Sequence, residues 1–117
     1  MPDLRVYGLQ DGVNNKFYFP LLDPNATDGS YIASVTIASG DATLMKDGGT
    51  FTTTNSVFVD EGGGYYSILL NGTNEMDFSV GVIKIVDQTA TKEWVDQSII
   101  VHTIAHSSAL HRGLAGV

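Results

Sequence analysis

Two glycine clusters decide the fold of this chain: "LMKDGGTF" at residues 44–51 and "VDEGGGYYSILL" at residues 59–70. Each cluster lies between short runs of β-branched, aromatic and other apolar residues. Because glycine readily adopts the positive φ of tight turns, both stretches predict two strands joined by a sharp reversal. A phosphate-binding loop would need a lysine after its last glycine, or a helix that begins directly behind the glycines. Neither follows here, so we interpret the glycines as turn residues.

The same pattern of short apolar runs and polar turns extends through the rest of the chain. It predicts further strands at residues 4–9, 16–22, 31–39, 80–87 and 97–104. Pro20 has no amide proton to donate to a neighbouring strand, so its run should lie at a sheet edge or end there. Residues 71–79 form the one mid-chain segment that suits a helical turn. About seven or eight short strands at regular spacing indicate an all-β sandwich or barrel.

Alternation along these runs also assigns side chains to the core. Successive side chains of a strand point to opposite faces of the sheet, so every second residue faces inward. Lys84 must reach water, which places its two isoleucine neighbours on the buried side. Ile83 and Ile85 are therefore the expected core residues, while Val35 and Ile37 should share one face of their strand, and so should Tyr66, Ile68 and Leu70.

Adjacent aromatic residues in one strand cannot both face the core, because their side chains point to opposite faces. One residue of the pair Tyr18–Phe19 and one of the pair Tyr65–Tyr66 should therefore face solvent or a partner. Trp94, in the connection "TKEWVDQ", can either fill the core or anchor an interface. We favour the core for this residue.

Composition narrows the classes of partner. The chain has 117 residues, a size typical of one domain, and 43% of them are hydrophobic, which is enough for a substantial core. Only 16% are charged, and 13 acidic against 6 basic residues give a net charge of −7. This acidity argues against nucleic acid and anionic membranes as partners. There is no cysteine, which excludes disulfides and thiolate metal sites, and the first residues lack the pattern of a signal peptide.

None of the polar clusters assembles a catalytic or metal-binding pattern. His102 and His106 have the i, i+4 spacing of a helical zinc site, but His102 lies in a predicted strand. The polar loop at residues 23–30 lacks the ligand positions of a calcium-binding loop. Asp60 and Glu61 are neighbours in a predicted strand, so their carboxylates should point to opposite faces. We therefore expect no enzyme activity, no catalytic residue, no cofactor and no metal.

The composition changes after residue 104. The segment "AHSSALHRGLAGV", residues 105–117, is rich in small residues and has no β-branched residue before the final valine. We interpret it as a C-terminal arm that orders against a partner, or as a frayed tail. The expected β-sandwich domain then covers residues 1–104, within which residues 1–30 would contribute edge strands or an N-terminal arm.

Three stretches taken together resemble a known family. They are "SVTIASGDATLMKDGGTF" (34–51), "GGGYYSILL" (62–70) and "VGVIKIVDQTATKEWVDQSIIV" (80–101). A K-D-G-G hairpin, a G-x-Y strand and a paired strand before W-x-D are similar to the small immunoglobulin-like (Ig-like) proteins encoded among the structural genes of tailed bacteriophages. The resemblance covers residues 31–104 and implies an Ig-like antiparallel β-sandwich that lacks the Ig disulfide. It also makes Tyr65 or Tyr66 resemble the tyrosine of an Ig-type corner.

The resemblance further implies a non-enzymatic virion structural protein. Several such phage proteins resemble capsid decoration or cement subunits, head–tail or tail adaptors, or tail-fibre-attachment modules. We therefore expect this chain in the virion, assembled in the host cytoplasm, where it binds the major capsid protein or tail and neck proteins as a homo-oligomer; a trimer would favour decoration. The expected partner-binding residues are Tyr18, Tyr65, Trp94, Leu110, His111, Arg112 and Leu114. The alternative is a carbohydrate-binding sandwich for host-surface attachment, with Trp94 or Tyr65 as the stacking ring.

Overall fold

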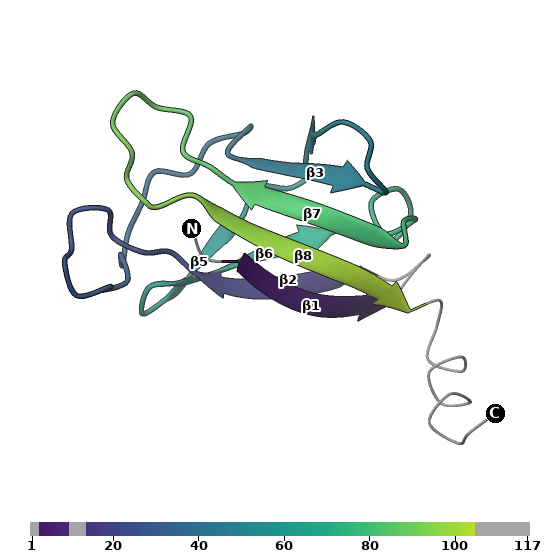
Figure 1. Cartoon of the computed structure of the whole chain (residues 1–117), viewed down its shortest axis with the longest axis horizontal. Helices are drawn as coiled ribbons and strands as arrows, with labels where there is room; N and C mark the ends of the chain where they lie inside the picture. Colours follow the sequence, from purple (N-terminus) through teal and green to yellow (C-terminus); the bar gives the residue numbers. More distant parts are fainter. Residues whose placement is uncertain (1–2, 10–13, 105–117) are drawn as a thin grey trace, which may run out of the picture.

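The computed structural model describes residues 3–9 and 14–104, and this part of the chain consists of strands and loops (Figure 1). Its strands, in chain order, are β1 (Asp3–Leu9), β2 (Asn15–Pro20), β3 (Ala42–Lys46), β4 (Thr52–Thr53), β5 (Val59–Gly62), β6 (Tyr65–Leu70), β7 (Val80–Ile85) and β8 (Gln97–Ile104). The expected all-β class is thereby confirmed. β2 ends at Pro20 and lies at a sheet edge, as the missing amide proton requires. The C-terminal arm expected at residues 105–117 lies outside the described residues.

The strands form two sheets that pack face to face. The larger sheet has the order β1-β8-β7-β3-β4 and the smaller has the order β2-β6-β5. In Figure 1 the larger sheet lies in front of the smaller one. The strand order is that of an Ig-like sandwich. In Ig nomenclature, β2, β6 and β5 correspond to strands B, E and D of one sheet. Strands β8, β7 and β3 correspond to G, F and C of the other. One pair departs from the expected antiparallel pattern, because β1 runs parallel to β8.

Both glycine clusters are turns, as the sequence predicts. At the reversal between β3 and β4, Asp47 and Gly48 have φ of 47° and 80°. Between β5 and β6, the glycines at 62–64 have φ between 65° and 95°, a range that only glycine adopts at little cost. Gly64 has a second constraint, since a Cβ at this position would lie 2.6 Å from Cβ of Tyr31. The three glycines therefore allow the chain to reverse tightly beside another segment.

The strand predicted at residues 31–39 is wrong. The segment is an extended loop with one isolated bridge, at Tyr31. Its amides find partners outside a ladder; Thr36, for example, donates to the Glu93 carboxylate at 2.7 Å. The residues of the loop that pack against the core are Ile32, Val35 and Ile37. The alternation of apolar residues correctly indicated that one side of the segment is partly buried. It could not show that the segment has no neighbouring strand to pair with.

Tyr66 ties this loop to the smaller sheet. Its hydroxyl donates to the carbonyl of Ile32 at 2.9 Å. The tyrosine of an Ig corner stands near the start of strand F and bonds to the backbone a few residues upstream. Tyr66 stands in β6, which takes the place of strand E, and its acceptor is 34 residues away in sequence. The hydrogen bond is therefore a long-range anchor for the loop and not a tyrosine corner.

The core lies between the sheets and contains the two predicted core residues of β7 and the three residues of β6 that were predicted to share a face. These fully buried residues are Tyr66, Ile68, Leu70, Ile83 and Ile85. Each adjacent aromatic pair has one ring inside and one outside. Phe19 is 1% exposed beside Tyr18 at 55%, and Tyr66 is 0% exposed beside Tyr65 at 44%. Alternation thus predicts correctly which ring of each adjacent aromatic pair is buried in a paired strand.

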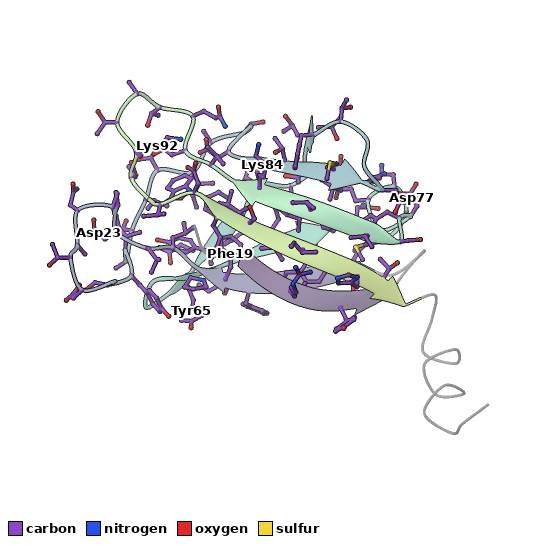
Figure 2. The ribbon with its side chains drawn as sticks, in the orientation of Figure 1. Phe19, Asp23, Tyr65, Asp77, Lys84 and Lys92 are labelled. Atoms are coloured by element: carbon purple, nitrogen blue, oxygen red, sulfur yellow. The ribbon has the colours of Figure 1, made fainter. Side chains whose placement is uncertain are left out.

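Four aromatic rings form the centre of this core. Phe58 meets Phe19, Tyr66 and Trp94 edge-on, with centroid distances of 5.6, 5.9 and 5.6 Å. Trp94 is completely buried, and its Nε1–H donates to the carbonyl of Ile85 at 3.1 Å. The core position favoured for Trp94 is confirmed. Phe19, which Figure 2 labels, belongs to this buried core.

Truncation of Phe58 tests whether this cluster stabilises the fold. We expect Phe58→Ala to lower the free energy of unfolding by about 3–5 kcal/mol, because it leaves a cavity among three rings. Chemical denaturation followed by the fluorescence of Trp94 measures the change. Phe51→Ala is the matched control, since Phe51 is 38% exposed, and it should cost less than about 1 kcal/mol. Equal losses in the two variants would contradict a central role for the cluster.

Candidate interaction surface

The outer side of the smaller sheet carries a group of exposed apolar side chains. In the register of this sheet Tyr18 and Val59 both lie opposite Ser67, so the three residues share one face. Alternation along β6 places two further residues on that face. We define the tyrosine face as the surface formed by Tyr18, Tyr31, Val59, Tyr65 and Leu69, whose exposed fractions range from 37% to 55%.

The loop at residues 23–30 brings Tyr31 to this face. The amide of Asp23 closes the loop by donating to the carbonyl of Ser30 at 2.9 Å, and the Asp23 carboxylate accepts the amide proton of Asn25 at 2.9 Å, a common turn contact of aspartate. Beyond the loop, the ring of Tyr31 meets the ring of Tyr65 edge-on, with a centroid distance of 5.5 Å and an interplanar angle of 87°. The hydrogen bond to Tyr31 and the charge of its phenolate raise the pKa of Tyr65. The Tyr65 hydroxyl is therefore neutral at neutral pH.

A polar pair crosses the tyrosine face. Glu61 accepts a hydrogen bond from Oγ of Ser67 at 2.6 Å and pairs with Lys16 at 3.4 Å. The hydrogen bond from Ser67, helped by Lys16, lowers the pKa of Glu61, so the carboxylate is charged at neutral pH. Nζ of Lys16 also lies 5.7 Å from the ring centroid of Tyr18. Aromatic residues are enriched in protein contact surfaces, so the exposed rings of this face favour such a contact.

The residues predicted to bind a partner fall into three groups. Tyr18 and Tyr65 lie together on the tyrosine face and are about half exposed. Trp94 was predicted wrongly as a contact residue, because its ring is 0% exposed and its indole N–H is already bonded inside the core. The remaining ones, Leu110, His111, Arg112 and Leu114, lie outside the described residues.

Three members of the tyrosine face were missed in the sequence. Val59 and Leu69 follow the same alternation that exposes Tyr65, so the pattern of the hairpin at residues 59–70 contained their signal. Tyr31 had no such signal. It reaches the face through the bridge to Leu22 at the other end of the loop and through the close approach to Gly64, which is distant in sequence.

The other polar groups are dispersed or serve the fold. Within residues 3–9 and 14–104 no three potential metal ligands gather, and no pocket is found. His102 lies in β8 with its ring 5.7 Å from that of Tyr7. Asp60 accepts the amide proton of Gly62, whereas Glu61 turns toward Ser67, so these neighbouring carboxylates do not converge. The same part of the chain has no helix that is long and apolar enough to cross a membrane.

Several carboxylates hold loop backbones, a role that their positions in the sequence did not indicate. Asp87 is 2% exposed and accepts the amide protons of Thr89 and Glu93 at 2.9 and 2.8 Å. Burial by itself raises the pKa of Asp87, but the hydrogen bonds from Thr89 and Glu93 and the charge of Lys92 outweigh burial and lower it. Asp41, Asp47 and Glu75 accept backbone amide protons of other loops in the same way.

Acid should destabilise the protein in part through Asp87. A carboxylate with a lowered folded pKa contributes stability above its unfolded pKa of about 3.9, and this contribution is lost as the pH falls through the folded pKa. We expect Asp87→Asn to lower the free energy of unfolding at neutral pH, and the difference from wild type to shrink below about pH 4. Urea denaturation at several pH values measures it. Asp96→Asn, which removes an exposed pair with Lys92, should have little effect at any pH. A pH-independent effect of Asp87→Asn would rule out this role.

Comparisons with known proteins do not indicate a role for the tyrosine face, which is therefore interpreted from its own side chains. No protein-family model, no curated protein and no solved structure matches this chain. The face combines exposed rings, a satisfied ion pair and a backbone held by a regular sheet. These properties suit a surface that binds a partner.

Proposed function

We propose that this protein is a non-enzymatic binding subunit that attaches to another protein through the tyrosine face. The observation that carries the proposal is the gathering of Tyr18, Tyr31 and Tyr65, which are 44–55% exposed, on one side of the sandwich. Tyrosine offers a large apolar ring with a hydroxyl that can form hydrogen bonds, and it is enriched at the centres of protein interfaces. Several such rings on one face favour a protein contact there.

The arrangement of the rings supports this proposal further. Tyr65 is braced by Tyr31, and Lys16 lies beside the ring of Tyr18. Strand β6, which carries Tyr65, is the central strand of its sheet and is paired along both edges. Because these side chains are held before a partner binds, little conformational entropy is lost on association.

Within this class we favour a virion structural protein of a tailed phage. The support is the resemblance of residues 31–104 to small Ig-like phage proteins, together with the Ig-like strand order. As a cement or decoration subunit the protein would bind the major capsid protein, and as an adaptor it would bind a tail or neck protein. A homotrimer would favour decoration, whereas a ring of higher order would favour the tail.

A carbohydrate-binding module is the second candidate, and the exposed ring of Tyr65 favours it. An aromatic face can stack on the apolar face of a sugar ring. Trp94 is buried and cannot contribute. The rings of Tyr31 and Tyr65 are nearly perpendicular, at 87°, so they do not form one flat platform. For this reason we place sugar binding behind protein binding.

Binding should depend on the exposed tyrosines of the smaller sheet. We expect the protein to form a complex with a capsid or tail protein encoded in the same genome, as measured by size-exclusion chromatography with light scattering. Tyr65→Ser should weaken this complex about 30-fold, which corresponds to the loss of about 2 kcal/mol at an interface centre. Tyr7→Ser is the matched control, because Tyr7 is 72% exposed on the other sheet.

The outcomes separate the candidates. Loss of the complex in Tyr65→Ser and in Tyr18→Ser, with Tyr7→Ser close to wild type, supports the tyrosine face as the contact surface. Absence of a complex with every virion protein tested would refute the virion role. Shifts of the Tyr65 ring signals in NMR on titration with sugars, without binding to any of these proteins, would support the carbohydrate-binding module instead.

A further inference from the structure

The larger sheet presents a second apolar surface on its outer side. Ile100, Val82 and Met45 lie directly opposite one another in the register of β8, β7 and β3, and Arg5 of β1 extends the row. Their chain neighbours Ile99, Ile83 and Leu44 are at most 2% exposed in the core, so alternation turns the row outward. Lys84 follows on the same side of β7, where Figure 2 labels it. We define the apolar-basic face as the surface formed by Arg5, Met45, Val82, Lys84 and Ile100.

Further exposed rings and apolar side chains surround this face. Tyr7 and Val80 are both aligned with His102 in the adjacent row and are 72% and 40% exposed. Phe51, which is 38% exposed, lies next to Lys84, with its ring centroid 4.5 Å from Nζ. Apolar side chains thus extend over β1, β8, β7 and β3, which lie side by side in Figure 1. Met45, Val82 and Ile100 of the central row are half-buried, whereas Tyr7, Val80 and Phe51 around them are exposed. Contiguous exposed apolar side chains with a polar border mark protein contact sites.

Two described side chains of the apolar-basic face, Arg5 and Lys84, are positively charged and lie in no ion pair with another described side chain. Asp3 stands two residues before Arg5, so alternation assigns the two positions to the same side of β1. Lys16, Lys46 and Lys92 each lie within 3.4 Å of a carboxylate. Among the side chains that the structure describes, Arg5 and Lys84 have no such partner. In a chain with a net charge of −7, two unpaired cations therefore border the same apolar row.

Charge discriminates between the possible occupants of this face. A second copy bound by twofold symmetry would bring the same two cations to the same surface, which like-charge repulsion opposes. Residues 105–117 of the chain contain no acidic residue and include Arg112 and two histidines, so they do not complement the face either. A partner with apolar side chains between carboxylates complements both the row and its cations.

We propose that the apolar-basic face binds a second protein through an acidic, apolar contact surface. Carboxylates of this partner pair with Arg5 and Lys84, while its apolar side chains cover the row from Ile100 to Met45. This goes beyond the function proposed for the tyrosine face, because the two faces lie on the outer sides of different sheets and can be occupied together. The protein then connects two partners across the thickness of one sandwich.

The probe for this proposal is a soluble peptide of about 12 residues in which glutamate alternates with valine and leucine, so that one side of its strand is acidic. It is titrated into the isotope-labelled full chain and followed by NMR. We expect shifts of the amide signals of β3, β7 and β8, and none with a peptide that has lysine in place of glutamate. The affinity should fall about fivefold in Arg5→Ser/Lys84→Ser, and it should also fall between about 50 and 500 mM salt.

Lys92→Ser is the matched control, because it removes an exposed lysine from the connection between β7 and β8, outside both faces, and should leave the affinity unchanged. Equal shifts with the lysine peptide, shifts confined to the tyrosine face, or no shifts at all would overturn the proposal. Dimerisation of the wild-type protein through this face in sedimentation experiments would also overturn it, since the occupant would then be a second copy. No virion protein enters the test, so its result is independent of the proposed role of the tyrosine face.

Discussion

The edge-on contacts of Phe58 with Phe19, Tyr66 and Trp94 are the interaction on which the two-layer structure depends. The chain has no cysteine, so no disulfide can join the sheets as it does in antibody domains. Packing has to replace that covalent link. Phe19 and Tyr66 belong to the smaller sheet, whereas Trp94 lies in the connection between β7 and β8 and bonds to Ile85 of the larger sheet. One group of rings therefore holds both layers together.

The loops outside the sheets depend on a different interaction. The segments at residues 31–39 and 86–96 have few ladder bonds, and their amides need other acceptors. The carboxylates of Glu93, Asp41 and Asp87 provide them. Several acidic side chains of the chain therefore hold its own loops. For this reason a net charge of −7 does not by itself identify a partner.

Turns and strand faces could be predicted from the sequence, because they depend on residues that are close together in the chain. The glycine turns, the strand at residues 97–104 and the inward positions of Ile83 and Ile85 follow from period-two alternation and from the φ preferences of glycine. The loop at 31–39 was mistaken for a strand because its side chains alternate, although no strand lies beside it. The candidate site shows the same limit: Tyr18 and Tyr65 follow from the sequence, but the position of Tyr31 depends on the close approach to Gly64, which is distant in sequence.

The parallel pairing of β1 with β8 has a consequence for biosynthesis. Asp3 lies opposite Ser98 and Leu9 opposite Ile104. Strand β1 can therefore pair only after β8 has been synthesised. A ribosome releases the chain from its N-terminus, and Arg5 and Tyr7 remain without their neighbours until β8 has emerged. Closing so long a loop is slow compared with forming the β5–β6 hairpin. The larger sheet is therefore completed late, and the outer surface to which β1 contributes forms only when nearly the whole described chain has been synthesised.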